Sequence, residues 1–309
     1  MLSALLLTAG LGTRLDPITR LVAKPAAPLG DRTLVEHVIG WLADQHVREA
    51  VANLHYLPAT ITGVLGDGSH LGLRLRYSWE QPVLGSAGGP RRALPLIESD
   101  PFVIVNGDTI CRFDLAPLIE THYTTGAAVT MAVVPNPAPA HYNGILAGDD
   151  GIVDGFIARG HSARSWHFVG VQIVSKRVFA HLADGAPAET VAGIYRDLVA
   201  TAPGSVRIWQ TQASFLDIGT PHDYLTAALA QPPDAWRDVT IARSARVTRS
   251  ALWPGTTIDE RVALADCIVA GVHVPAGLDA RNAIIVPAGC VRPGERVSVH
   301  GDVAVFPIA

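Results

Sequence analysis

Apolar and polar residues alternate along the first part of the chain in blocks that favour strands and helices in turn. Apolar runs predict strands at the amino terminus and around residues 50–54, 73–77 and 102–105. Helical spacing predicts helices near residues 34–45, residue 60 and residues 90–96, the first opened by Thr33 and Glu36 at the spacing of a capping box. Strands that alternate with helices predict an α/β fold with a doubly wound, mixed, mostly parallel sheet.

The pattern changes twice farther along the chain. Residues 128–174 are rich in strand formers, with a hairpin turn at Asp149-Asp150-Gly151, and predict an inserted β region that covers a second substrate. A linker is predicted at Gln231-Pro232-Pro233-Asp234. Beyond it, apolar residues recur at nearly six-residue steps, namely Ile241, Val247, Leu252, Ile258 and Leu264. This rhythm predicts a short parallel β-helix whose register slips near Cys267 and Val272, with an irregular β tail as the alternative.

Length and composition favour a folded protein with one large domain, over residues 1–230, and a tail over residues 231–309. The chain has 309 residues, of which 49% are hydrophobic and 17% charged, with a net charge of −4. The sequence has no basic stripe interleaved with aromatic residues, which argues against a nucleic-acid partner. The three cysteines lack CxxC spacing, so neither a disulfide framework nor a zinc site is expected. The apolar amino terminus has no basic flank and is too short to span a bilayer, so we expect a cytoplasmic protein with no membrane partner.

A glycine-bearing turn follows the first predicted strand. Leu6 to Thr19 read LLTAGLGTRLDPIT, and Ala23-Lys24-Pro25 follow. Glycine lets backbone N–H groups approach an anion closely, Arg14 offers a planar fork of donors, and Lys24 offers a compact charge. The spacing alone also fits a tight turn with two solvated cations, because such glycine motifs are common. The third glycine of the dinucleotide fingerprint is missing, and no GxxxxGK[ST] occurs.

Two carboxylates and a glycine-rich stretch are further candidates. Asp108 lies in FVIVNGDTI at the end of a predicted strand, which suits Mg²⁺, although NGD is also an ordinary turn. Asp217 lies in FLDIGTPHDY, where Pro221 is well placed to open a helix. The stretch VLGSAGGPRRA, residues 83–93, offers small residues against which a flat base can lie, or else a flexible loop.

Taken together, the string from Leu6 to Gly30 resembles the signature of the NDP-sugar pyrophosphorylases. It is most similar to the mannose-1-phosphate guanylyltransferase and N-acetylmuramate-1-phosphate uridylyltransferase branches. Leu84 to Gly88 resembles the LGTAG segment of guanylyltransferases, and FLDIGTPHDY resembles the segment that supplies the family's second metal carboxylate. The resemblance implies a Rossmann-like, GT-A-like nucleotidyltransferase fold. It also implies a left-handed β-helix tail that supports oligomer contacts or regulation.

The resemblance also implies roles for individual residues. It implies that Arg14, Lys24 and Asp108 are catalytic, with Arg14 on the β and γ phosphates and Lys24 near the α-phosphate, and that Asp108 and Asp217 bind Mg²⁺. The nucleotide-binding residues that it implies are Ala9, Gly10, Leu11, Gly12, Thr13, Arg14, Gln81, Ser86, Ala87, Gly88 and Asn106. The sugar-phosphate-binding residues are Gly144, Arg159 and Gly170, although Ala158-Arg159-Gly160 replaces the family's Glu-Lys-Pro.

These residues predict an enzyme that forms an NDP-sugar and pyrophosphate from a sugar 1-phosphate and an NTP, with GTP favoured and UTP possible. In this reaction a sugar-phosphate oxygen attacks the α-phosphorus in line, and no general base is needed. One alternative is a catalytically silent regulatory subunit that binds an NDP-sugar. Another is an acyltransferase built on the tail, which would need more coils and a catalytic histidine. His161 and His167 are expected to be structural or surface residues, and the chain is expected to form a homo-oligomer.

Overall fold

The computed structural model describes residues 2–232 and 236–308. The chain folds into two compact units. The sheet unit comprises Met1–Gly10 and Val35–Phe215, and the coil unit comprises Leu11–Leu34 and Leu216–Ala309. Of the linker predicted at residues 231–234, Pro233 and Asp234 lie outside the described residues. The predicted domain boundary near residue 231 stays a prediction.

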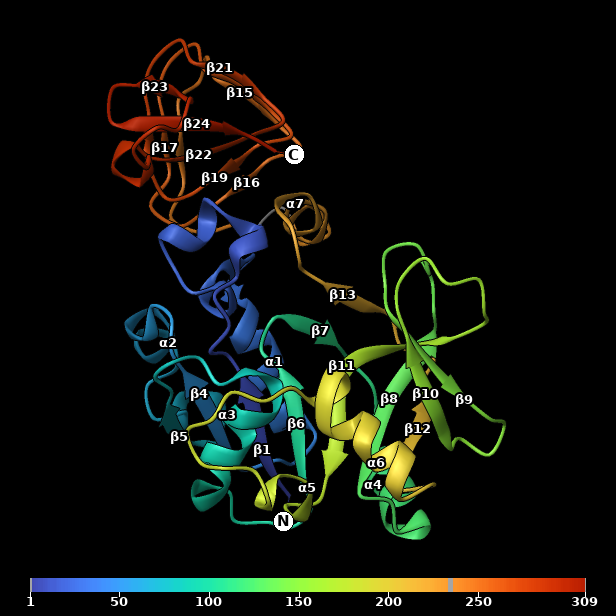
Figure 1. Cartoon of the computed structure of the whole chain (residues 1–309). Helices are drawn as coiled ribbons and strands as arrows, with labels where there is room; N and C mark the ends of the chain where they lie inside the picture. Colours follow the sequence, from blue (N-terminus) through green and yellow to red (C-terminus); the bar gives the residue numbers. More distant parts are fainter. Residues whose placement is uncertain (1, 233–235, 309) are drawn as a thin grey trace. The chain divides into compact units, whose positions relative to one another are not determined.

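The sheet unit is built on one nine-stranded sheet, with the order β10-β9-β11-β6-β1-β4-β5; off this path, β8 pairs with β11 and β12 pairs with β8 (Figure 1). The strands are β1 (Ser3–Leu7), β4 (Glu49–Leu54), β5 (Arg74–Trp79), β6 (Phe102–Asn106), β8 (Val129–Pro135), β9 (Gly144–Ala147), β10 (Val153–Ile157), β11 (Trp166–Val174) and β12 (Val206–Gln210). The pairs β1–β4, β1–β6, β4–β5 and β8–β12 are parallel, whereas β11 is antiparallel to β6, β8 and β9. The predicted mixed α/β fold is confirmed.

Helices pack against this sheet along its length. They are α1 (Leu34–Asp44), α2 (Pro58–Leu65), α3 (Gly85–Ala93), α4 (Ala116–Thr125), α5 (Arg177–Ala180) and α6 (Tyr195–Thr201), with shorter turns η4 (Ser69–Leu71), η5 (Leu94–Leu96) and η6 (Thr190–Ile194) and the short strand β7 (Thr109–Cys111). Helix α3 contacts β1, β4 and β5, α4 contacts β8 and β11, and α6 contacts β10 and β12. Leu5, Ile104 and Met131 are among the fully buried residues of the core between them.

Helix α3 differs from the sequence prediction, which placed a helix over residues 90–96. The glycine-rich stretch is itself helical from Gly85, and residues 94–96 form a separate 3₁₀ turn. Glycine is a poor helix former, so the sequence disfavoured this start. Tertiary packing reverses the preference, because a Cβ on Gly88 would lie 2.5 Å from the Ala186 carbonyl oxygen and one on Gly89 would overlap Glu80 Oε1.

The strand-rich region of residues 128–174 joins the main sheet and does not form a layer of its own. Strand β11 pairs directly with β6, so the sheet continues into this region without a break. Strands β9 and β10 form the predicted antiparallel hairpin around Asp149-Asp150-Gly151. The hairpin therefore lies at one edge of the sheet, beyond β11.

Parallel coils make up most of the coil unit (Figure 1). Three stacked parallel sheets contain β14 (Thr240–Ile241), β17 (Thr257–Ile258) and β20 (His273–Val274); β15 (Arg246–Thr248), β18 (Ala263–Ala265) and β21 (Asp279–Arg281); and β16 (Ala251–Leu252), β19 (Ile268–Val269) and β22 (Ala283–Pro287). Arg246 pairs with Ala263 and Ala263 pairs with Asp279, so the successive coils span 17 and 16 residues. Three hexapeptides would need 18, which accounts for the predicted slips of register. The handedness of the coils stays a prediction.

The coil unit also contains elements that the hexapeptide rhythm did not predict. Strands β23 (Ser298–His300) and β24 (Val303–Pro307) close the coils, with β24 antiparallel to β22, and the turn η8 (Ala288–Cys290) precedes them. The segment of residues 11–34 contributes η1 (Thr13–Leu15), η2 (Ile18–Arg20), η3 (Lys24–Ala26), β2 (Pro28–Leu29) and β3 (Arg32–Thr33).

Helix α7 (Pro221–Leu229) follows strand β13 (Phe215–Asp217) and begins as predicted. Pro221 is in the first turn, and Thr220 and Asp223 form a capping box that satisfies the exposed N–H groups of the helix start. Among the described residues, no helix combines the length and the apolar character that crossing a membrane requires.

Candidate functional site

A cavity of about 260 Å³ opens at the carboxyl ends of the parallel strands of the sheet unit. Leu7, Asn53 and Asn106 end β1, β4 and β6 or lie near their ends, and all three line this cavity, which we call the first cavity. Ligands of open α/β sheets bind at this edge. Of the residues predicted to bind nucleotide or metal, Ala9, Gly10, Ser86, Asn106 and Asp108 line it.

Asp108 follows β6 by two residues and is half-buried at the cavity wall. Within residues 2–232 and 236–308, no three His, Cys, Asp or Glu side chains gather as a group that would hold a metal ion. A magnesium site needs fewer protein ligands, because Mg²⁺ usually takes one or two carboxylates and completes its shell with substrate phosphates and water. The hard carboxylate oxygens of Asp108, at the strand edge where phosphate binding is predicted, fit this requirement. Asp217, the other predicted ligand, belongs to the coil unit.

Two buried polar residues that the sequence reasoning missed organise the first cavity. Glu80 is fully buried, and its carboxylate accepts hydrogen bonds from Asn53 Nδ2 at 2.7 Å and from the Leu84 N–H at 2.8 Å. Asn53 Oδ1 in turn accepts from the N–H groups of Thr8 at 2.6 Å and Ala9 at 3.2 Å. The Glu80–Asn53 network therefore ties the start of the glycine turn to the loop that opens α3. The signal that could have identified Asn53 is its place as a polar residue within the apolar strand run AVANL.

The glycine-rich stretch borders the same cavity and packs against residues 186–190. Gly85 has a φ of +75°, and a Cβ there would lie 2.5 Å from Glu189 Oε1. The Ser86 hydroxyl donates to Glu189 Oε2 at 2.5 Å, and the N–H of Ala87 donates to the Ala188 carbonyl at 2.9 Å. The glycines therefore serve close packing. Gln81 is exposed and does not line this cavity.

A second cavity, of about 390 Å³, adjoins the first and shares Leu7, Ser86 and Asn106 with it. Phe156, Ile157, Ala158, Phe168 and Gln172, from β10, β11 and the loop after β10, also line it, as do Asn143 and residues 189–192 and 196. An apolar wall with a few polar groups suits a ligand that is partly apolar and partly hydrogen-bonding, such as a sugar ring.

The three predicted sugar-phosphate residues lie beside this second cavity but do not line it. Gly170, with φ of +79°, lies at an irregularity of β11, and a Cβ there would lie 3.1 Å from Asn106 Nδ2. Gly144 is buried, and a Cβ there would lie 2.5 Å from Ser165 Oγ. Arg159 is exposed, and its N–H donates to Asn143 Oδ1 at 3.0 Å. The adjacent residues Asn143 and Ala158 line the cavity in their place.

The two histidines of this region have structural surroundings. The His167 ring packs against Tyr142, with ring centres 4.2 Å apart, and against Phe215 at 4.8 Å. Burial lowers the pKa of His167 to about 4, so the ring is neutral near pH 7. His161 Nδ1 accepts a hydrogen bond from the Ala163 N–H at 3.1 Å.

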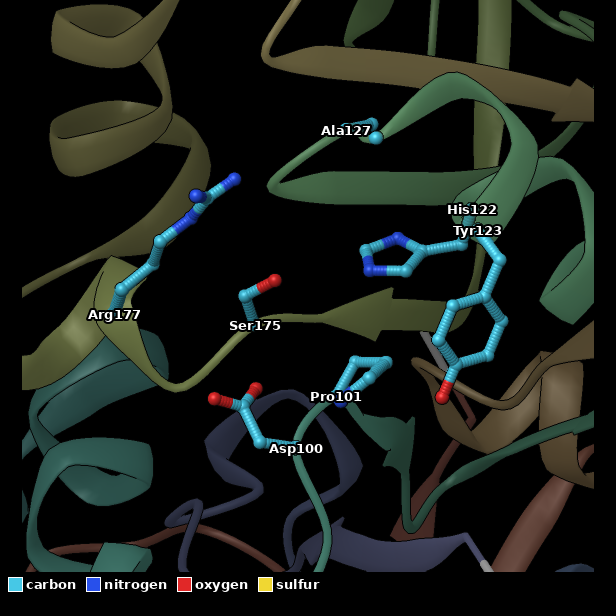
Figure 2. Close-up of a pocket in the computed structure, with 8 residues that line it drawn as sticks. Asp100, Pro101, His122, Tyr123, Ala127, Ser175 and Arg177 are labelled. Carbon is cyan, nitrogen blue, oxygen red and sulfur yellow. The ribbon is translucent and has the colours of Figure 1, made fainter.

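A third cavity, of about 290 Å³, lies at the opposite edge of the sheet, around the residues that precede β6 and β8 (Figure 2). Asp100, His122, Ser175 and Arg177 line it, and it contains none of the predicted site residues. His122 is buried against Thr130, with 3.0 Å between Nδ1 and Oγ1, and burial lowers its pKa. This histidine therefore belongs to the packing between α4 and β8.

In the coil unit, the predicted phosphate-binding residues form a tightly packed turn. Gly12 has a left-handed φ of +63°, and a Cβ there would lie 2.9 Å from Thr19 Cγ2 and 3.0 Å from Lys24 Cβ. The Thr19 hydroxyl also donates to the Gly12 carbonyl at 3.2 Å. Lys24 is buried, with 7% of its surface exposed. Glycine at position 12 is thus required both by the backbone conformation and by the close approach of Lys24.

The same unit brings the glycine turn next to the FLDIGTPHDY segment. The Arg14 guanidinium lies so close to Gly219 that a Cβ there would be 3.1 Å from Arg14 Nη1. Asp223, which caps α7, also lies beside Gly219, and its Oδ2 would be 3.3 Å from the same Cβ position. Two motifs that are about two hundred residues apart in the sequence are therefore neighbours around Gly219.

Comparison with known proteins places these features in a family. Residues 3–232 match the family model described as nucleotidyl transferase. The mannose-1-phosphate guanylyltransferase of Mycobacterium tuberculosis is 25% identical over 93% of this chain and 82% of its own length. The D-glycero-alpha-D-manno-heptose 1-phosphate guanylyltransferase of Aneurinibacillus thermoaerophilus is 27% identical over 73% of this chain and 96% of its own length.

Among solved structures, HddC from Yersinia pseudotuberculosis complexed with GMP-PN has a similar fold. Its TM-score is 0.64 at 24% identity, with 74% of this chain and 98% of that chain covered. These matches confirm the family predicted from the sequence: the chain belongs to the nucleotidyl transferase family.

Proposed function

We propose that this protein is a sugar-1-phosphate nucleotidyltransferase that forms an NDP-sugar and pyrophosphate, with GTP as the favoured nucleotide. The observation on which the proposal rests is the first cavity, where Ala9, Gly10, Ser86, Asn106 and Asp108 meet at the carboxyl ends of parallel strands. The adjoining second cavity is large enough for a sugar ring and shares a wall with the first. The similarity to guanylyltransferases for mannose 1-phosphate and for a heptose 1-phosphate supports GTP and a hexose or heptose phosphate.

The chain's own residues would position two anions that repel each other. Two unit charges about 4 Å apart interact by roughly 4 kcal/mol at an effective dielectric constant near 20. The N–H groups of Gly10 to Thr13 and the side chains of Arg14 and Lys24 would offset this repulsion along the triphosphate. A phosphate monoester is already a nucleophile near neutral pH, so in-line attack on the α-phosphorus needs positioning more than proton transfer.

Asp108 and Asp217 would bind a Mg²⁺ ion, which suits their carboxylate oxygens. When bound, the ion would neutralise phosphate charge as pyrophosphate leaves. Ser86, which lines the first cavity, would lie along the base, and Asn106, Asn143 and Gln172, which line the second, would meet the sugar. The cytoplasmic placement and the homo-oligomer expected from the sequence are parts of the same proposal.

The test is pyrophosphate release by the purified protein with Mg²⁺, each of the four NTPs and a panel of sugar 1-phosphates. The panel contains mannose, glucose, N-acetylglucosamine, N-acetylmuramate and heptose 1-phosphates. We expect GTP to support release with at least one of them. Asp108→Asn and Lys24→Ala are expected to lower turnover roughly a hundredfold or more, since each removes a preorganised charge. Parental rates in either variant would refute these roles, and binding of NDP-sugar without turnover would favour the silent regulatory subunit.

A further inference from the structure

The segment of residues 11–34, which is predicted to bind phosphate, contacts the end of the coils mainly through Arg20. Arg20 Nε donates to Asp16 Oδ1 at 2.8 Å, and Nη2 also donates to Asp16 Oδ2. On its other side, Nη1 and Nη2 donate to the two Glu295 oxygens at 2.6 Å each, and Nη1 donates to the Cys290 carbonyl at 2.6 Å. The guanidinium also lies over the Phe306 ring, 5.2 Å from its centre.

This arrangement uses all five N–H groups of the guanidinium. Two parallel hydrogen bonds to each of two carboxylates form the geometry in which arginine binds most strongly. Only 8% of the Arg20 side chain is exposed, so solvent competes little with these contacts. Hydrogen bonding to Arg20, together with the Arg292 N–H, lowers the pKa of Glu295 to about 2, so the carboxylate stays charged at any ordinary assay pH.

The residues held by Arg20 lie within the predicted phosphate-binding turn. Asp16 directly follows η1, which contains Arg14, and Arg20 ends η2, which contains the Thr19 that packs against Gly12. Asp16 and Arg20 flank Thr19, so holding both in place also holds the Thr19 side chain against Gly12. Arg292 adds a weaker contact to Asp16 Oδ1 at 3.4 Å, from the same end of the coils.

We infer that Arg20 and Glu295 are positioning residues, through which the C-terminal segment of residues 288–308 holds the triphosphate-binding turn in its active conformation. The inference rests on the proposed function, because the turn matters only if Arg14 and Lys24 bind the NTP. The tail then contributes to the chemistry itself, besides the oligomer contacts or regulation expected from the sequence.

The test compares Glu295→Ala and Glu295→Gln with the parent in steady-state kinetics. Glu295→Ala removes both acceptors, whereas Glu295→Gln keeps one, so its effect is expected to be smaller. We expect Glu295→Ala to raise KM for GTP roughly tenfold and to lower kcat, with KM for the sugar 1-phosphate unchanged, because only the triphosphate-binding turn is loosened. Urea unfolding of each variant shows whether it is folded under the assay conditions.

The matched control is Asp266→Ala, which breaks the exposed Arg249–Asp266 ion pair of the same coils, 2.7 Å between Nε and Oδ1. It is expected to leave all three kinetic parameters at the parental values. The inference is overturned if Glu295→Ala behaves like this control, or if KM for both substrates changes equally. Should Glu295→Ala fail to fold, the same split in Glu295→Gln decides the question. An inactive parent would refute the proposed function, whereas an active parent with an unaffected Glu295→Ala refutes only this inference.

Discussion

The Glu80–Asn53 network offers a sharp test of how the first cavity is built. In Asn53→Asp, one carboxylate oxygen still accepts from the N–H groups of Thr8 and Ala9. The other oxygen takes the place of the Asn53 Nδ2 amino group, which in the parent donates to Glu80 Oε1 at 2.7 Å. A donor is thus exchanged for a second negative charge in a site where Asn53 is 3% exposed and Glu80 is fully buried.

The size of the effect follows from that distance. Two charges 2.7 Å apart repel by about 6 kcal/mol at an effective dielectric constant near 20. Proton uptake and relaxation reduce this value, and leaving a buried charge unpaired typically costs about 3 to 5 kcal/mol. We therefore expect Asn53→Asp to lower the free energy of unfolding by about 3 kcal/mol. Because Ala9 begins the glycine turn, kcat/KM is expected to fall at least roughly tenfold as well.

The double variant Asn53→Asp with Glu80→Gln restores the pair with the donor and acceptor exchanged. The amide introduced at position 80 can donate to the carboxylate introduced at position 53, while the amide oxygen accepts from the Leu84 N–H. Urea unfolding and pyrophosphate release are measured for the parent, both single variants and the double variant. The reasoning predicts that the double variant recovers to within about 1 kcal/mol of the parent, since complementary partners couple in such cycles.

Thr130→Val is the matched control, because it also removes a buried polar group, in this case the Thr130 hydroxyl that contacts His122 at the opposite edge of the sheet. It should lower stability without a comparable fall in kcat/KM. A double variant no more stable or active than Asn53→Asp alone would refute the account of this network.

Three further predictions concern other parts of the chain. Gly12→Ala is expected to lower kcat/KM roughly a hundredfold, because a Cβ at a φ of +63° would displace Lys24. Its control is Gly255→Ala, at a φ of +82° with nothing within 4 Å of the added Cβ, which should lower stability only. Equal kcat/KM values of the two variants would contradict this. Tyr224→Phe is expected to lower the free energy of unfolding by about 2 kcal/mol, because it removes the hydroxyl that accepts a hydrogen bond from Trp253 Nε1 at 2.7 Å. An unchanged urea midpoint would count against that contact. His167 has a pKa of about 4 in the folded protein, below its value in the unfolded chain. The unfolded chain therefore binds the extra proton, and the free energy of unfolding falls as pH drops from about 6.5 to 4. The urea midpoint should fall less over this pH range in His167→Phe than in the parent.

The sequence predicted the elements of the fold best where local pattern and tertiary packing agree. The strands that became β1, β4, β5 and β6 and the helix that became α1 have the periodicities of their surroundings. The start of α3 at Gly85 was missed, because its glycines are explained by tertiary neighbours, chiefly the atoms of residues 80 and 186–189 that approach them. The coil lengths of 17 and 16 residues depart from the hexapeptide rhythm for a similar reason, since the pairing of neighbouring coils sets their register.

The same distinction, between local pattern and distant partners, separates the site residues that were predicted from those that were missed. Ala9, Gly10, Asn106 and Asp108 lie at strand ends or shortly after them, and the rule that ligands bind at the carboxyl ends of parallel strands brings them to one cavity. Glu80 and Asn53 were missed, since a single buried polar residue in an apolar run is informative only once its partner is known. The contacts of Arg20 with Glu295 join residues 275 positions apart, a separation at which no local pattern is informative.

The central claim is that a sugar-phosphate oxygen attacks the α-phosphorus of the NTP. It is tested most directly with a sugar 1-phosphate that contains ¹⁸O in every phosphate oxygen, incubated with GTP, Mg²⁺ and the protein, followed by mass spectrometry of both products. The account predicts an NDP-sugar that retains all of the label, including the oxygen that bridges its two phosphates, and one unlabelled pyrophosphate per NDP-sugar. Label in pyrophosphate or in free phosphate, or GTP consumption without an NDP-sugar, would contradict it.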